Sequence, residues 1–122
     1  MDIAREFDYL GSPYSHKDPF VREYRYLQAM QRVSHLLKNN FWVYSPIVHC
    51  HELKKIVELP HEHDFWLAYD LVMLEKARAL QVLCLPNWQD SLGLGIEIRH
   101  AKAVGKPIYY VEHPLEHIDL VR

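Results

Sequence analysis

The stretch Gln81–Glu97, QVLCLPNWQDSLGLGIE, decides the fold class that this chain is expected to adopt. Its first five residues are almost entirely apolar and stop at Pro86, which is typical of a short strand covered on both faces. Gly93 and Gly95 then open a segment with helical spacing that runs to Val104. A buried strand that leads through a loop into a helix is the repeating unit of a parallel α/β sheet.

Strands and helices alternate on both sides of this stretch. The patterns predict strands at 7–10, 41–45, 81–85 and 107–111, helices at 19–38, 64–80 and 91–104, and a weaker polar helix at 50–58. Such alternation predicts right-handed crossovers. We therefore expect an α/β, three-layer Rossmann- or flavodoxin-like fold, with a mostly parallel sheet of four or five strands and helices on both faces. The whole chain, residues 1–122, is expected to form one domain.

The composition and net charge exclude several classes of function for this chain. The net charge is −2 over 122 residues, so no overall attraction to a nucleic acid polymer or an anionic membrane is expected. No apolar run approaches the ~20 residues that span a bilayer, and the first residues lack the apolar core of a secretory signal. The two cysteines, Cys50 and Cys84, are too few for a disulfide framework. These features predict a cytoplasmic protein with reduced thiols.

A ligand site is expected at the carboxyl ends of the strands, as in other parallel α/β sheets. Ser91–Glu97 falls there, where glycines let a ligand approach the backbone and free N–H groups at a helix start favour an anion. The alternative is a glycine-rich turn followed by a solvated Glu97. The segment has no GxGxxG pattern, so it does not predict a dinucleotide site.

Asp70 is the second candidate, because it lies in an apolar helical stretch, Phe65–Val72. A carboxylate among bulky apolar groups is costly to bury unless it is paired, which indicates a functional role. The alternative is that Asp70 points outward beside Glu75 or Lys76.

Histidines form two H-x-H pairs, His49 with His51 and His61 with His63. The second pair resembles the start of a metallohydrolase HxHxDH motif, but Phe65 replaces its last histidine. A divalent metal site or a histidine-rich loop that caps a helix both fit this pattern, and we expect no cofactor. Aromatic residues near the loops are suited either to stacking on a planar base or to core packing: Tyr14, Tyr44, Trp66 and Trp88.

Three segments together resemble the nucleoside 2-deoxyribosyltransferase family and its relatives, the 2′-deoxynucleoside 5′-phosphate N-hydrolases. They are Tyr9–Tyr14 (YLGSPY), the mid-chain Asp70, and Ser91–Glu97 followed by Gly105–Ile108 (GKPI). The likeness runs from about Phe7 to Glu112.

This resemblance implies a reaction: cleavage of the N-glycosidic bond in 2′-deoxynucleosides or their 5′-monophosphates, through a covalent deoxyribosyl–Glu97 intermediate. Hydrolysis or base transfer would complete it. Asp70 would orient the sugar and manage the proton of the leaving base, and Tyr9 would help to position Glu97. The substrate-binding residues implied are Gly11, Ser12, Pro13, Ser91, Gly93 and Gly95.

Ser91 also bears on the substrate. The transferases carry Asp here, against the free 5′-hydroxyl, whereas the 5′-phosphate hydrolases carry Ser, which can donate to a phosphate. Ser91 therefore favours a nucleotide 5′-monophosphate. Family members assemble as dimers or larger, so the resemblance implies a homo-oligomer, and the helix carrying Tyr24, Tyr26 and Met30 can supply the surface, although core packing explains these residues equally well.

Two departures keep other functions open. Arg99 replaces the family glycine two residues after the nucleophile, and residues 112–119 lack the asparagine with which the transferases complete a neighbouring site. These features favour a non-catalytic nucleotide-binding or sensing module. A metal-dependent hydrolase that uses the histidine pairs is the third hypothesis.

Overall fold

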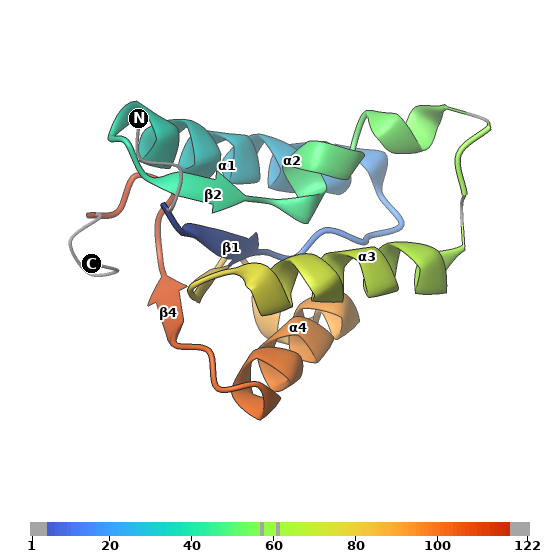
Figure 1. Cartoon of the computed structure of the whole chain (residues 1–122). Coiled ribbons are helices and arrows are strands. Elements are labelled where there is room, and N and C mark those ends of the chain that lie inside the picture. The colour runs from blue at the N-terminus through green and yellow to red at the C-terminus, as the bar shows by residue number, and fades with distance from the viewer. Residues whose placement is uncertain (1–4, 57, 61, 118–122) are drawn as a thin grey trace.

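A four-stranded, fully parallel sheet forms the centre of the described chain (Figure 1). The computed structural model describes residues 5–56, 58–60 and 62–117. The strands are β1 (Phe7–Gly11), β2 (Trp42–Tyr44), β3 (Leu80–Leu83) and β4 (Ile108–Val111), and they lie in the order β2-β1-β3-β4. This order is flavodoxin-like, so the expected α/β fold is confirmed, with four parallel strands in the described part of the chain.

Helices cover both faces of the sheet (Figure 1). Helix α1 (Pro19–Lys38) connects β1 to β2. Three helices lie between β2 and β3: α2 (Pro46–Cys50), η1 (Leu53–Lys55) and α3 (His63–Lys76). Two lie between β3 and β4: η2 (Trp88–Asp90) and α4 (Leu92–Ala103). Successive side chains along a strand point to opposite faces of the sheet, so the core has two parts, one on each face. Tyr9 packs with Leu74 of α3 and Leu94 of α4, whereas Leu10 packs with Val33 of α1. None of the described helices combines the length and apolar character needed to cross a lipid bilayer.

Helix starts follow capping chemistry that is visible in the sequence. Asp18 accepts a hydrogen bond from the backbone N–H of Phe20, and Pro19 opens α1. Ser45 and Pro46 form the same arrangement at α2. The predicted weak helix at 50–58 is therefore wrong: α2 begins at Pro46, and among the described residues of 51–58 only the short η1 is helical.

The boundary between α3 and β3 also differs from the prediction. Helix α3 ends at Lys76 rather than Leu80, because the backbone N–H of Arg78 already bonds to the Phe7 carbonyl at 2.8 Å. Leu80 is thus the first residue of β3, and the strand ends at Leu83.

Helix α1 buries a charged side chain against the sheet beside its apolar contacts. Arg32 is fully buried; it donates to the side-chain oxygen of Gln81 at 2.9 Å and to the backbone carbonyl of Glu116 at 2.8 Å. Gln81 in turn donates to Asp8 at 2.9 Å. Most of the apolar stripe that predicted this helix is exposed instead: Phe20, Tyr24, Leu27, Met30 and Leu37.

Candidate active site

A cavity of about 460 Å³ lies where the chain direction across the sheet reverses. The chain goes from β1 outward to β2 and then returns past β1 to β3, and ligands bind at such switch points. The volume falls in the range of small-molecule sites. The lining includes Ser12 and Tyr14 after β1, His51 and Lys54 after α2, Trp66 and Asp70 on α3, and Ser91, Gly93 and Glu97 around the start of α4.

Glu97 lines this cavity with a largely buried side chain, since 7% of the residue is exposed. The Tyr9 hydroxyl donates a hydrogen bond to Glu97 Oε2. Gly11 allows the approach from the other side, because a Cβ on Gly11 would lie 3.3 Å from Glu97 Oε1. Burial raises the pKa of Glu97 to about 8; the Tyr9 hydrogen bond lowers it and nearby Asp70 raises it.

Tyr9 holds Glu97 in place without lining the cavity itself. It is fully buried in β1 and is absent from the cavity lining. Burial raises the pKa of Tyr9 well above its usual range, and the charges of Glu97 and Asp70 add to this effect. The phenol therefore keeps its proton and acts as a hydrogen-bond donor to the carboxylate.

Asp70 lines the same cavity from α3 and does not point outward beside Glu75, which pairs instead with His100 at 2.8 Å. Burial raises the pKa of Asp70 to about 6, and the positive charge of Lys54 opposes this shift. The two predicted carboxylates thus share one cavity, although they come from different helices.

Three buried polar atoms have no hydrogen-bond partner among the described residues: Ser12 Oγ, Tyr44 Oη and Asp70 Oδ1. Ser12 is only 6% exposed and lines the cavity, as does Asp70. Buried polar groups are nearly always satisfied in native structures. Unpaired groups at a cavity are therefore suited to binding a polar ligand.

The start of α4 forms one end of the cavity. Ser91 caps the helix, with Oγ accepting from the Leu94 N–H at 3.2 Å, so its own hydroxyl hydrogen is free to be donated to a ligand. A Cβ on Gly93 would meet no atom within 4 Å, which leaves open space beside the helix N-terminus. This combination suits an anion.

Three of the predicted binding residues, Gly11, Pro13 and Gly95, lie outside the cavity lining. Gly11 and Pro13 are buried, and Gly11 lies against the Glu97 side chain. A Cβ on Gly95 would be nearest to Arg99 Nη1, at 3.4 Å. Gly95 therefore makes room for Arg99 and does not contact the cavity. Arg99 itself does not line the cavity, so its guanidinium does not narrow it.

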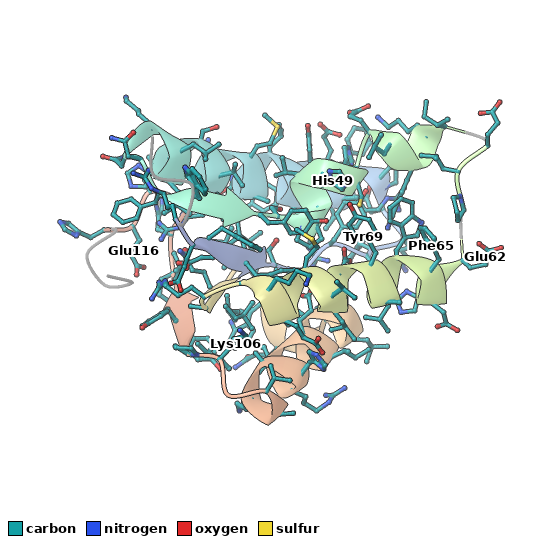
Figure 2. The ribbon with its side chains drawn as sticks, viewed as in Figure 1. His49, Glu62, Phe65, Tyr69, Lys106 and Glu116 are labelled. Atoms are coloured by element: carbon teal, nitrogen blue, oxygen red, sulfur yellow. The ribbon has the colours of Figure 1, made fainter. Side chains whose placement is uncertain are left out.

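The two histidines of the first pair have different surroundings in the structure. His49 stacks on Tyr69 with ring centroids 5.8 Å apart (Figure 2), whereas His51 and His63 line the cavity. His61 lies outside the described residues. Within the described ranges, no group of three or more His, Cys, Asp and Glu side chains is placed to hold a metal ion.

Sequence reasoning missed the contributions of His51 and Lys54. Lys54 Nζ lies 5.9 Å from the ring centroid of Tyr14 and 5.6 Å from that of Trp66, so a cation and two aromatic rings meet at the cavity. Of the four aromatic candidates, Tyr14 and Trp66 line the cavity. Trp88 packs on Tyr110 instead, at 5.7 Å.

The fold and this cavity define a flavodoxin-like α/β domain with a buried Tyr–Glu pair and a second carboxylate at the switch point. The chain belongs to the family described as "Domain of unknown function (DUF1937)", whose model matches residues 7–113. The matched segment runs from β1 to just beyond β4 and includes every residue that lines the cavity. No curated protein matches the chain.

Proposed function

We propose that this protein cleaves the N-glycosidic bond of 2′-deoxynucleosides or their 5′-monophosphates. One observation carries the proposal: Glu97, held by Tyr9, shares a cavity of about 460 Å³ with a second, half-buried carboxylate, Asp70. Enzymes that break glycosidic bonds use two carboxylates in different environments, one of which attacks the sugar in the retaining type. The resemblance of Tyr9–Tyr14 and Ser91–Glu97 to the nucleoside 2-deoxyribosyltransferase family supports the same chemistry.

In this mechanism the ionised carboxylate of Glu97 attacks C1′ of the sugar. The C1′–N bond breaks, its electron pair leaves with the base, and a deoxyribosyl ester forms on Glu97. Asp70, on α3, orients the sugar and assists proton transfer to the leaving base. Water then attacks C1′ in hydrolysis, or a second base attacks it in transfer, and Glu97 is released.

The start of α4 supports a 5′-monophosphate as the preferred substrate. Ser91 and the open space at Gly93 adjoin the helix N-terminus, and Lys54 adds a positive charge to the lining. A neutral hydroxyl and free N–H groups accommodate a phosphate, and Lys54 offsets the charge of Asp90, which also lines the cavity. Equal binding of a deoxynucleoside and its monophosphate would contradict this preference.

The test is incubation with a panel of deoxynucleosides and their monophosphates, with free base measured by chromatography. Mass spectrometry of the quenched reaction should detect protein carrying one deoxyribosyl group. Glu97→Gln should abolish both signals and retain ligand binding. Glu75→Gln on the exposed side of α3 is the matched control and should keep full activity. Absence of free base with every substrate would refute the proposal.

A non-catalytic nucleotide-binding or sensing module is the second candidate. The raised pKa of Glu97, about 8, favours it, because a protonated carboxyl group is a poor nucleophile at neutral pH. In that case calorimetry would detect nucleotide binding by the wild type, but no base would be released at any pH up to 9.

The exposed stripe of α1 supports a homo-oligomer with a second copy of this chain as the partner. The stripe consists of large exposed apolar side chains along one helix: Phe20, Tyr24, Leu27, Met30 and Leu37. An antiparallel pair of α1 helices that crosses near the middle of the helix would bring the two stripes into contact. A two-fold interface uses the same surface on both copies and would cover these apolar side chains.

A further inference from the structure

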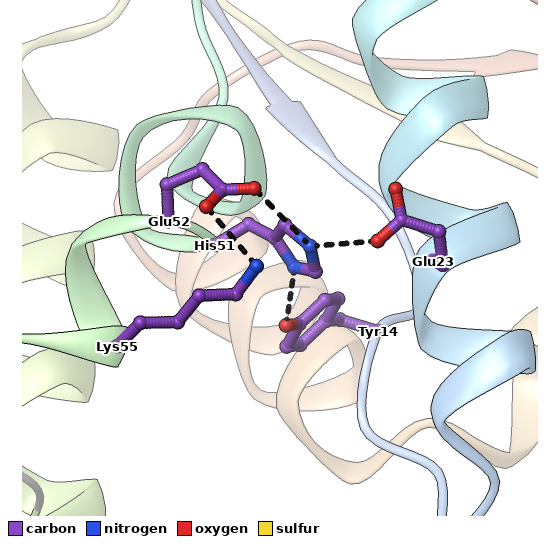
Figure 3. A network of polar contacts seen from close by, with 5 residues as sticks. All are labelled: Tyr14, Glu23, His51, Glu52 and Lys55. Carbon is purple, nitrogen blue, oxygen red and sulfur yellow. Dashed lines mark hydrogen bonds and ion pairs between the residues drawn. The ribbon is translucent and has the colours of Figure 1, made fainter.

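A second hydrogen-bonded group lies at the cavity, separate from Tyr9, Glu97 and Asp70 (Figure 3). The Tyr14 hydroxyl lies 2.6 Å from His51 Nδ1, and His51 Nε2 lies 3.1 Å from Glu23 Oε1. Tyr14 and His51 line the cavity, whereas the Glu23 side chain is 51% exposed. The three side chains therefore form a continuous path from the cavity to solvent.

His51 is held firmly in this path. It is buried, and its ring stacks on Tyr26 with centroids 4.0 Å apart and planes at 17°. Glu52 Oε1 also faces Nε2, at 4.0 Å, and Lys55 holds Glu52 by an ion pair of 3.0 Å. Because ionised carboxylates only accept hydrogen bonds, Nε2 carries a hydrogen in either protonation state of the ring.

The protonation state of His51 then decides what Tyr14 offers to a ligand. When the imidazole is neutral, Nδ1 is an acceptor and the Tyr14 hydroxyl hydrogen is committed to it. When the imidazole is protonated, Nδ1–H donates to the Tyr14 oxygen, and the hydroxyl hydrogen is free to be donated into the cavity. The charged groups that face the ring are Glu23 on α1 and Glu52 beyond α2, with Lys54 over the Tyr14 ring at 5.9 Å.

We propose that Tyr14, His51 and Glu23 form a proton relay that supplies the proton required by the departing base. This inference rests on the proposed glycosidic chemistry. As the C1′–N bond breaks, a nitrogen of the base takes the hydroxyl proton of Tyr14, and the Tyr14 oxygen takes the Nδ1 proton of His51. After the base leaves, a proton from solvent in the cavity reaches the Tyr14 oxygen while the Tyr14 hydroxyl proton passes back to His51 Nδ1, and the carboxylate of Glu23 stabilises the resulting imidazolium through Nε2–H.

The site requires such a donor because Asp70 is a poor acid at neutral pH. Its pKa of about 6 leaves most of it ionised at pH 7 and above. Burial raises the pKa of Tyr14, so its phenol is protonated throughout this range. Tyr14 is thus the catalytic acid that touches the substrate, and His51 and Glu23 are positioning residues that act through it.

The experiment compares two substrates in the full-length protein: a deoxynucleotide that the wild type cleaves, and p-nitrophenyl 2-deoxyriboside, whose leaving group needs no proton. Tyr14→Phe should lower kcat on the deoxynucleotide by at least about 10²-fold, the usual contribution of an acid catalyst, and leave kcat on the activated substrate within a few-fold. His51→Gln should lower the deoxynucleotide rate and leave the rate on the activated substrate within a few-fold. His49→Gln, two residues away and outside the cavity lining, is the matched control and should change neither.

Glu23→Gln keeps the test valid if His51→Gln does not fold, because Glu23 is half exposed and its isosteric replacement disturbs no core packing. It should slow the deoxynucleotide reaction more than the activated one. Equal losses on both substrates in Tyr14→Phe would show a binding role and overturn the relay, as would unchanged rates. A wild type that is inert on both substrates would instead refute the glycosidic function itself, and the relay with it.

Discussion

The Tyr9 hydroxyl donates its hydrogen bond to the carboxylate of Glu97, a residue 88 positions further along the chain. The contact forms because β1 pairs with β3, and the chain leads from β3 through η2 to the start of α4. The hydrogen bond lowers the pKa of a carboxyl group that burial raises to about 8. Tyr9 therefore controls the charge on the proposed nucleophile.

Tyr9→Phe should shift the titration of Glu97 to higher pH. The change removes the hydrogen bond that favours the ionised carboxylate, while burial continues to favour the neutral acid. A ¹³C NMR titration of labelled glutamate side chains should show an apparent pKa above about 8 for Glu97. Tyr44→Phe is the control, because the Tyr44 hydroxyl has no partner among the described residues. An unchanged Glu97 titration in Tyr9→Phe would contradict the prediction.

The stability of the protein should fall as the pH rises from 6 to 8.5. The pKa of Glu97 rises from its ordinary 4.5 to about 8 on folding, so between these values the folded chain binds more protons than the unfolded chain. The free energy of unfolding then decreases with pH, by about 1.4 kcal/mol for each unit of raised pKa that is crossed, and levels off above pH 8.

Urea denaturation at several pH values measures this effect. In Glu97→Gln the decline over this pH window should largely disappear, because the amide does not titrate. Glu75→Gln, a half-exposed carboxylate at the end of α3, should decline like the wild type. Parallel curves for wild type and Glu97→Gln would show that Glu97 titrates normally.

Gly11→Ala should destabilise the protein and disturb the position of Glu97. Its Cβ would lie 2.9 Å from Leu94 Cδ1 as well as 3.3 Å from Glu97 Oε1, and overpacking of this kind costs about 1–3 kcal/mol. Both the melting temperature and turnover should fall.

Gly93→Ala is the matched substitution in open space, since no atom lies within 4 Å of its Cβ. It should be neutral or slightly stabilising, by at most about 1 kcal/mol. Because Gly93 lines the cavity, the added methyl group should weaken nucleotide binding in calorimetry. Wild-type affinity in Gly93→Ala would place the phosphate elsewhere.

Leu27→Glu combined with Met30→Glu should convert an oligomer into a monomer. Both side chains lie on the exposed stripe of α1, and the variant would bring four carboxylates together across a two-fold interface. Light scattering after size exclusion measures the mass. Lys102→Glu on the exposed side of α4 should leave the mass unchanged. A monomeric wild type would exclude this interface.

Much of the fold was predictable because its signals are local. Asp18 followed by Pro19 marks the start of α1, and the apolar run near Gln81 marks a buried strand. Both features reflect the chemistry of a few neighbouring residues. The start of α2 carries the same signal at Ser45 and Pro46, but the prediction overlooked it.

The site was only partly predictable. Glu97 and Asp70 stood out because a carboxylate in a glycine-rich turn or an apolar helix is unusual, and both line the cavity. Gly95 carried the same kind of signal but lies against Arg99. His51 was singled out only as a member of a metal-like pair, since its partners Tyr14 and Glu23 are distant in the chain.

Helix α1 shows which features the sequence determines and which depend on the tertiary structure. The sequence by itself determined that residues 19–38 are helical, because the apolar spacing, the cap and the proline act within one or two turns. Only the tertiary structure decided which face is buried. Arg32 faces the sheet because Gln81 and the carbonyl of Glu116 satisfy its guanidinium there, which leaves Leu27 and Met30 outside. Burial of a charge depends on partners from distant segments, and no local pattern specifies them.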